Sequence, residues 1–322
     1  MILQAIKDGI VKGLRTALML LAIMIPIYLG VTVLRHTAFF AWLSERIEPA
    51  MRIFGLPGEA VIPLVVGAFS DEYASVAAMS GFSFNMAQVT IISMIVMAFH
   101  GLPIETVITR KIGMPAFRIA LFRVGLAVFT GVFVALLTAW FLGGNMPGDI
   151  PSDLAANTDR TVPAMSPVMS AGVFDASRDA IIHEMVFGVL NTVYLILRVL
   201  IPLMIGIELM MMYKVIEAMA EKMGFFCRLL GIGKDALLPL LVGLFLGVTY
   251  GAGAIAEMNR VQPLAKRDMA LLGVFLFACH GIIENSYLFA LAGANVVIIS
   301  VVRLAIGIGV TMGAARLPII RE

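Results

Sequence analysis

Two His-Gly pairs are the residues of this chain whose type and position most clearly point to chemistry. His100-Gly101 and His280-Gly281 each lie in a stretch of apolar residues. A polar side chain in hydrocarbon is costly and normally faces a cavity or a partner, and an adjacent glycine can open the helix backbone to a ligand. We therefore expect both imidazoles to point inward and to bind a solute or a metal ion. The alternative is that each imidazole only joins two packed helices by a hydrogen bond.

Carboxylates interrupt two further apolar segments that are rich in alanine or glycine. Asp71 and Glu72 lie in AFSDEYASVAAM, and Glu257 lies in GVTYGAGAIAEM. Carboxylates at broken helices can bind a coupling cation, exchange a proton or accept hydrogen bonds from a polar substrate. For Glu257, a solvated position at a helix end is the alternative. The remaining candidates for the same substrate- or ion-binding cavity are Tyr73, Ser75, Glu105, Tyr250, Glu284 and Asn285.

The composition indicates that these residues belong to a membrane protein. Hydrophobic residues make up 61% of the 322 residues and charged residues 14%, whereas soluble proteins contain about 45–50% apolar and about 25% charged residues. The net charge is only +2 and the basic residues are scattered, so there is no basic surface for nucleic acid. Cys227 and Cys279 lack the spacing of a zinc or disulfide framework. We expect an all-α integral membrane protein.

A polar segment from residue 143 to 182 divides the chain. It contains several prolines among small polar residues, and aspartates dominate its charged residues. This composition is typical of a water-exposed connector, and its acidic character favours the extracytoplasmic side of the membrane. Residues 1–142 and 183–322 are therefore predicted to be two membrane units.

The two units carry the same motifs in the same order, which indicates an internal duplication. GLPGEAVIPLVVGAF at residues 55–69 matches GIGKDALLPLLVGLF at 231–245, and AFHGLPIETVI at 98–108 matches ACHGIIENSYL at 278–288. Two arginines also recur at equivalent positions, Arg123 and Arg303. They could neutralise the acids or meet an anionic substrate, and for Arg123 extension to a membrane interface is a further alternative.

Each unit is expected to cross the membrane three times, which gives the second unit an inverted orientation. Full spans are predicted at 16–39, 86–107 and 119–142 in the first unit, since a helix needs about 20 apolar residues to cross the hydrocarbon core. With both termini in the cytoplasm, most lysines and arginines fall on the cytoplasmic side. The exceptions are Arg35, Arg46 and Arg52.

Residues 59–79 and 235–258 are expected to form broken or re-entrant half-helices that do not cross fully. Proline and glycine weaken helix continuity, and such half-helices are tolerated where they are buried in protein or line water. A full crossing of the second segment is the alternative, because it is long enough to span. The residues expected to interrupt helices are Pro63, Gly67, Gly101, Pro239, Gly243 and Gly281.

Sequence signatures of enzymes fail on inspection. The segment GIGKDA resembles a phosphate-binding loop, but Arg228 replaces the first glycine and Asp235 the final Ser or Thr of GxxxxGK[ST]. The motifs GxSxG and HExxH, and a GxGxxG in a nucleotide-binding context, are also absent. We expect neither an enzyme nor an ATP- or GTP-driven motor.

The duplicated half-span with Pro-x3-Gly, followed by a span that ends in His-Gly, resembles the nucleoside recognition (Gate) domain membrane proteins. The residues that carry this resemblance are Pro63, Gly67, His100 and Gly101, repeated as Pro239, Gly243, His280 and Gly281. These proteins are similar to the gate regions of ferrous iron transport protein B and, more distantly, to concentrative nucleoside transporters. The resemblance implies transport by alternating exposure of a central site. It does not extend to iron, because Ser70-Asp71-Glu72-Tyr73 stands where the iron transporter's gate carries a cysteine.

The favoured function is a secondary transporter in the bacterial inner (plasma) membrane for a small polar or charged solute, driven by a proton or cation gradient. One alternative is a divalent metal ion permease with His100 and His280 as ligands, since imidazole and carboxylate groups suit iron, zinc or manganese. Another is a scaffold or accessory subunit that transports nothing. The expected partners are the solute or ion and the lipid bilayer, with homo-oligomerisation left open. No cofactor is expected apart from such a divalent metal.

Overall fold

The protein is built from helices. The computed structural model describes residues 2–111, 116–141, 178–261 and 263–317, and these contain no strand. This confirms the expected all-α class. Most of the predicted connector lies outside the described residues, and α9 begins at Arg178, before the predicted connector ends.

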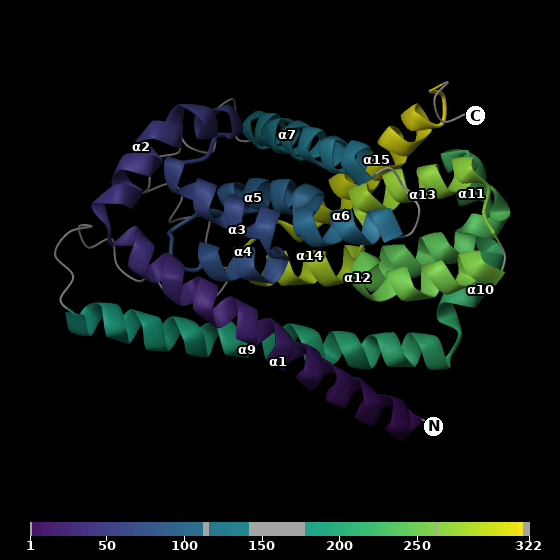
Figure 1. Ribbon diagram of the computed structural model, residues 1–322, viewed down its shortest axis with the longest axis horizontal. Helices are drawn as coiled ribbons and strands as arrows, with labels where there is room; N and C mark the ends of the chain where they lie inside the picture. Colours follow the sequence, from purple (N-terminus) through teal and green to yellow (C-terminus); the bar gives the residue numbers. More distant parts are fainter. Residues whose placement is uncertain (1, 112–115, 142–177, 262, 318–322) are drawn as a thin grey trace.

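The described helices of the two halves follow a similar order, although the first half has two short 3-10 helices and the second has one (Figure 1). The first half contains α1 (Ile2–Arg35), α2 (Ala38–Met51), the short 3-10 helices η1 (Arg52–Phe54) and η2 (Gly58–Ala60), α3 (Val61–Phe69), α4 (Glu72–Met79), α5 (Met86–Phe99), α6 (Leu102–Lys111) and α7 (Ala116–Phe141). The second contains α9 (Arg178–Met212), α10 (Val215–Lys222), α11 (Gly224–Leu230), η3 (Lys234–Ala236), α12 (Leu237–Val261), α13 (Lys266–Cys279), α14 (Ile282–Leu291) and α15 (Val296–Ala314).

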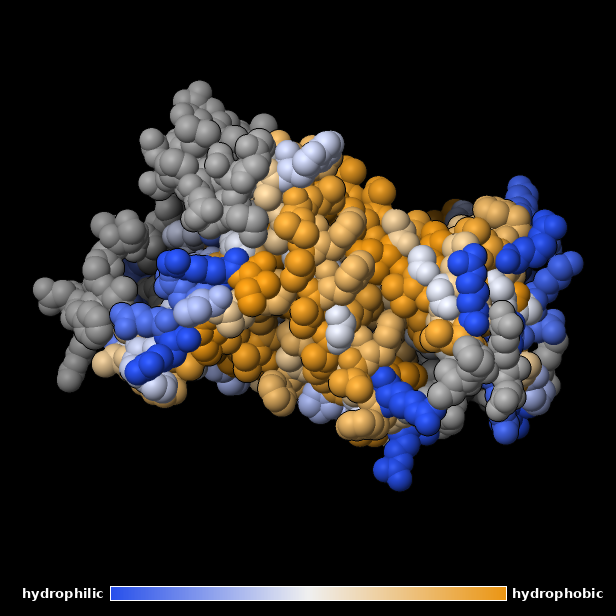
Figure 2. Space-filling view, turned by 90° about the horizontal axis from the view of Figure 1, so that it is seen from above, coloured by the Kyte–Doolittle hydropathy of each residue, from blue (hydrophilic) through white to orange (hydrophobic). Residues whose placement is uncertain are grey.

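Helical segments that can cross a membrane occur three times in each half of the described chain. They are Ile2–Leu34, Met86–Val107, Ala116–Phe141, Met185–Met212, Lys266–Leu291 and Val296–Ala314. On the face shown in Figure 2, hydrophobic side chains form a broad band across the middle of the molecule, and hydrophilic side chains gather at its two ends. The chain is a multi-pass membrane protein, and the membrane normal runs from one of these ends to the other.

The two halves run through this band in opposite directions (Figure 1). Helix α1 leads away from the end that holds the N-terminus, and α9 leads back towards it. Helices α7 and α15 are opposed in the same way, so that the start of α1 and the end of α15 lie at one end of the molecule. This arrangement is the inverted repeat that the odd number of spans in each half predicts.

The first predicted span, 16–39, differs from the structure at its C-terminal end. α1 ends at Arg35, and Thr37 caps a separate helix by accepting a hydrogen bond from the Phe40 N–H (3.2 Å). A threonine side chain in this position satisfies a free N–H of the first helical turn and so favours a new helix. The segments Ala38–Phe54 and Gly58–Phe69 then meet at an angle of 88°, as a broken or re-entrant segment.

The two predicted half-helix segments are both interrupted, although not at their prolines. Pro63 and Pro239 lie in the first turns of α3 and α12, where a proline removes no helical hydrogen bond. In the first half, the break lies before α4, where the Asp71 carboxylate accepts a hydrogen bond from the Ala74 N–H (2.7 Å). In the second half, α12 is broken at Gly247, with φ 75° and ψ 170°.

The longest helices of the two halves, α1 and α9, pack against each other through small residues. A Cβ atom added at Gly9 would lie 2.6 Å from the Ile205 Cα, and one at Gly13 would lie 3.2 Å from the Ile201 Cα. Glycines four residues apart allow this close backbone approach in membranes, where packing replaces the hydrophobic effect between helices. Lys12 forms an ion pair with Glu208 beside this contact.

The break at Gly247 yields a stability prediction. Its backbone conformation is nearly exclusive to glycine, and any other residue costs about 1–3 kcal/mol there. The nearest atom to an added Cβ is the Gly281 Cα at 3.8 Å, so the cost to Gly247→Ala is conformational and not steric. We expect this variant to lower the thermal unfolding midpoint of the purified protein in detergent. Gly125→Ala in α7, where nothing lies within 4 Å, is the matched control and should leave the midpoint unchanged or raise it. Equal losses in both variants would contradict the assignment.

Candidate functional site

Each His-Gly pair forms a joint between two short helices that together make one membrane span. His100 ends α5 with a ψ of 154°, and Gly101 follows with a φ of 57°. His280 ends α13 with a ψ of 161°, and Gly281 follows with a φ of 55°. The positive φ of both glycines belongs to the left-handed region that glycine enters without a steric cost. The sequence motif thus produces the same local bend twice.

The bends are held by equivalent contacts in the two halves. The Gly101 N–H donates a hydrogen bond to the Gly67 carbonyl (2.9 Å), and the Gly281 N–H donates one to the Gly243 carbonyl (3.4 Å). Gly67 and Gly243, which were predicted as helix breaks, therefore lie inside helices and brace the joints. A Cβ added at Gly67 would approach Val96 to 2.8 Å, so the helices also need the small residue for packing.

The two imidazoles meet at the centre of the protein, between the halves. The Nε2 atoms of His100 and His280 lie 3.2 Å apart, and both side chains are buried. The Nδ1 atom of His100 lies 3.3 Å from the Val96 carbonyl oxygen, and that of His280 lies 2.8 Å from the Leu276 carbonyl oxygen. A carbonyl can only accept, so each Nδ1 carries the proton and each Nε2 of a neutral ring presents a lone pair.

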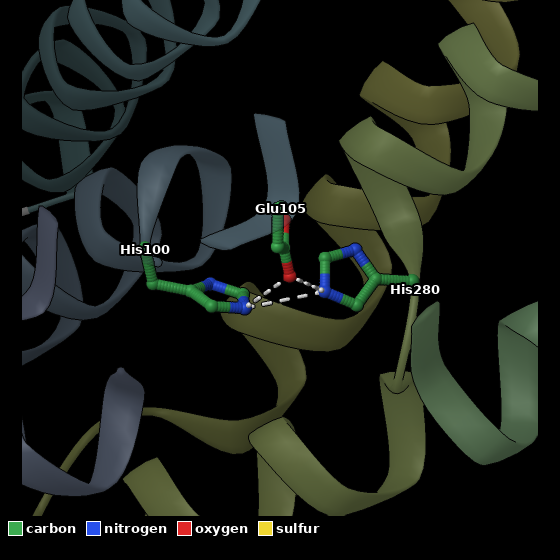
Figure 3. Close-up of side chains that lie close together, drawn as sticks. All are labelled: His100, Glu105 and His280. Atoms are coloured by element: carbon green, nitrogen blue, oxygen red, sulfur yellow. Dashed lines mark hydrogen bonds and ion pairs between the residues drawn. The ribbon is translucent and has the colours of Figure 1, made fainter. Parts of the chain in front are cut away.

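Glu105 joins the two histidines from one side (Figure 3). Its Oε1 atom lies 3.4 Å from the His100 Nε2 and 3.5 Å from the His280 Nε2. Its Oε2 atom lies 2.6 Å from an Nη1 of Arg123, which is 1% exposed. The three side chains His100, Glu105 and His280 have ligand atoms close enough together to hold a metal ion.

Arg123 also completes the broken end of α5. Its Nε donates to the Ala98 carbonyl (3.1 Å) and its Nη2 donates to the His100 carbonyl (2.6 Å). The last carbonyls of a helix have no partner within the helix, and they need one when they are buried. The arginine therefore satisfies the backbone at the joint and the Glu105 carboxylate together.

Two further contacts extend the site across the halves. The Glu72 Oε2 lies 3.2 Å from the His100 Nε2. The Tyr73 hydroxyl in α4 donates to the Glu284 Oε1 in α14 at 2.6 Å. We call the connected set the central cluster, and its members are Glu72, Tyr73, His100, Glu105, Arg123, His280 and Glu284.

The second half repeats the arginine but not its carboxylate. Arg303 donates through Nε to the Ala278 carbonyl (3.3 Å), as Arg123 does to Ala98. In the matched motifs, however, Asn285 stands where the first half has Glu105. Among the described residues, the Asn285 Nδ2 and the Arg303 Nη2 are buried without a hydrogen-bond partner. The two halves therefore differ in charge at equivalent places.

The structure brings most of the predicted site residues together, and it gives others a local role. Asp71 caps α4, and the Ser75 hydroxyl donates to the Pro63 carbonyl (2.8 Å), which braces α3 against α4. Tyr250 and Glu257 lie in α12 beyond its break, and their side chains are outside the described part of the chain.

The sequence left open whether the two arginines neutralise the acids or bind an anionic substrate, and whether Arg123 extends to the membrane interface. The structure buries both, with exposed fractions of 1% for Arg123 and 2% for Arg303. The signal that could have decided this is their recurrence in both halves, because a surface arginine needs no equivalent.

The repeated arginine provides a matched test of the Glu105–Arg123 ion pair. Arg123→Met leaves the buried Glu105 carboxylate without its partner, and breaking a buried pair in this way costs about 3–5 kcal/mol. Arg303→Met removes a guanidinium that has no such carboxylate, and we expect a smaller loss. The measurement is the thermal unfolding midpoint of both variants in one detergent. An equal or larger loss in Arg303→Met would show that the ion pair is not the stabilising contact.

Comparison with known proteins places the chain beside other membrane proteins. The family model Gate, described as nucleoside recognition, matches residues 17–115, which lie within the first predicted unit (residues 1–142) and include its His-Gly joint. The chain is also 29% identical over 310 residues to the "Uncharacterized membrane protein YvoD" of Bacillus subtilis (strain 168), across 96% of this chain and 93% of that protein. No solved structure matches it. The first half of the chain is thus similar to the nucleoside recognition (Gate) domain, and almost the whole chain is similar to another membrane protein.

Proposed function

We propose that the protein is a secondary transporter that moves a small polar or charged solute by alternating exposure of the central cluster. The observation that carries this proposal is the contact between His100 and His280, which joins two oppositely oriented halves through buried ionisable groups. Buried charges are weak contributors to stability, and within membranes they usually mark a path for a substrate or an ion. The Gate domain match supports a role in membrane transport.

The joints supply the mobility that this mechanism needs. In each half, the His-Gly joint lies between two helices of one span, so a small rotation there changes the direction of one helix while the other stays packed. Since His100 and His280 are the residues at the joints, the same rotation would separate the two imidazoles. Inverted repeats allow such a movement to open the site towards either side of the membrane.

The proposed energy source is an ion gradient. The phosphate-loop resemblance at residues 231–236 fails at two of its required positions, so ATP hydrolysis by this chain has no support. A gradient of protons or of another cation is the energy source that fits, because carriers of this architecture couple solute movement to an ion.

Uptake into proteoliposomes tests the transport function. We expect the purified protein to take up at least one member of a panel of nucleosides, amino acids, organic acids and divalent cations under an imposed proton or sodium gradient. His280→Gln should reduce this uptake to the rate of empty liposomes, because it removes one half's contribution to the cluster. His183→Gln, which changes an exposed histidine on α9, is the control and should retain uptake. No uptake of any member by the wild type would overturn the transport function.

The orientation in the membrane can be tested separately. We expect both termini in the cytoplasm and the connector outside it, in the plasma membrane of a bacterium, since basic residues favour the cytoplasmic side. A reporter active only in the cytoplasm should work when fused after residue 322 and fail when inserted at residue 160. The reverse pattern would invert the proposed direction of the whole chain.

A further inference from the structure

The three ligand atoms at the centre of the site have the spacing of a metal-binding site. The Nε2 atoms of His100 and His280 and the Oε1 of Glu105 form a triangle with sides of 3.2, 3.4 and 3.5 Å. Zinc binds imidazole nitrogen and carboxylate oxygen at about 2.0–2.2 Å, and tetrahedral geometry then separates neighbouring ligand atoms by about 3.3–3.6 Å. The triangle therefore has nearly the dimensions of one face of a zinc tetrahedron.

The tautomers of the histidines also require a positive charge between them. Both Nδ1 atoms face carbonyl oxygens, so in the neutral rings two Nε2 lone pairs face each other at 3.2 Å. Two acceptors repel at this distance unless a cation or a proton lies between them. Fixing Nδ1 on a backbone carbonyl is the arrangement by which proteins orient metal-binding histidines.

The charges of the central cluster favour a divalent cation. Three carboxylates, from Glu72, Glu105 and Glu284, lie in the cluster. Two buried guanidiniums, of Arg123 and Arg303, interact electrostatically with Glu72 and Glu105. When the three carboxylates are ionised, the two guanidiniums leave one net negative charge among these buried groups, and such an excess is costly unless it is balanced. Arg123 contacts the Oε2 of Glu105, which leaves the Oε1 free to face the histidines.

We propose that His100, His280 and Glu105 bind a divalent transition-metal cation of zinc's preference in a four-coordinate site. The inference rests on the transport function, because it names this cation as the transported solute. Two imidazoles and one carboxylate suit zinc better than magnesium or calcium, which prefer oxygen ligands throughout. The Glu72 Oε2 lies 3.2 Å from the His100 Nε2, beside the three ligands, and the fourth position is open to a water molecule, as in other zinc sites with three protein ligands.

The division of the ligands between the halves provides a route for release. His100 and Glu105 come from the first half, and His280 comes from the second. All three are buried, so the cation is enclosed in this conformation. When the halves separate, two ligands stay with the first half and one with the second. Zinc is held only weakly by one or two protein ligands. The movement that opens the site therefore also lowers its affinity.

Metal binding by the purified protein tests this inference. The full chain, prepared in detergent with an affinity tag free of histidine and treated with a chelator, is supplied with zinc and passed through a desalting column. We expect one zinc ion per chain by elemental analysis. The chain has four histidines in all, which gives a matched pair of double variants. His100→Gln with His280→Gln should retain no zinc, and His36→Gln with His183→Gln should retain one equivalent.

The visible absorption of bound cobalt(II) tests the site in the wild type, without any variant. Cobalt(II) replaces zinc in such sites and absorbs visible light strongly only when its coordination is tetrahedral. We expect this strong absorption from the wild type, with competition by zinc. The weak spectrum of octahedral cobalt, or zinc retained equally by both double variants, would overturn the inference.

The outcomes separate this inference from the transport function on which it rests. If the wild type binds no metal but its uptake of an organic solute depends on His280, the metal site is wrong and the transport function stands. If it binds zinc at the expected residues but moves no solute into liposomes, the transport function fails, and with it the assignment of the cation as the solute.

Discussion

Arg123 and Glu105 place a buried ion pair at the centre of an apolar protein, and the arrangement around it depends on how that pair is satisfied. The guanidinium contacts one carboxylate oxygen and two carbonyls at the end of α5. It therefore stabilises the carboxylate, the broken helix end and the position of His100 at once. Without the arginine, the chain would have to bury a carboxylate and two backbone acceptors with no compensation, which is costly in the absence of water.

The two repeats share the same backbone arrangement but differ in the side chains that they place at the site. The joints, their bracing by Gly67 and Gly243, and the arginine contacts to Ala98 and Ala278 recur closely. With Asn285 in the place of a second glutamate, Glu105 is the carboxylate of this motif that both imidazoles share. A symmetric pair of ion pairs would have satisfied each half by itself. Because of this asymmetry, the central cluster depends on residues from both halves.

The sequence predicts the class, the number of spans, the inverted relation and the inward histidines, because hydropathy and repetition are local signals. It does not predict the contact between Tyr73 and Glu284, since nothing in either segment indicates its partner in the other half. It places breaks correctly at Gly101 and Gly281 but wrongly at Pro63 and Pro239, because a proline near the start of a helix resembles one in its interior when the start is unknown. Asp71 as a helix cap and Gly247 as a break become distinguishable only once the neighbouring helices are in place.

The contact of α1 with α9 at Gly9 limits how the two halves can move relative to each other. Because the backbones approach so closely there, sliding one helix along the other would drive Ile205 into the larger residues on either side of the glycine. A change of crossing angle keeps the contact intact. The contact between α1 and α9 can thus act as a pivot. It allows the two halves to rock relative to each other and prevents them from sliding past each other.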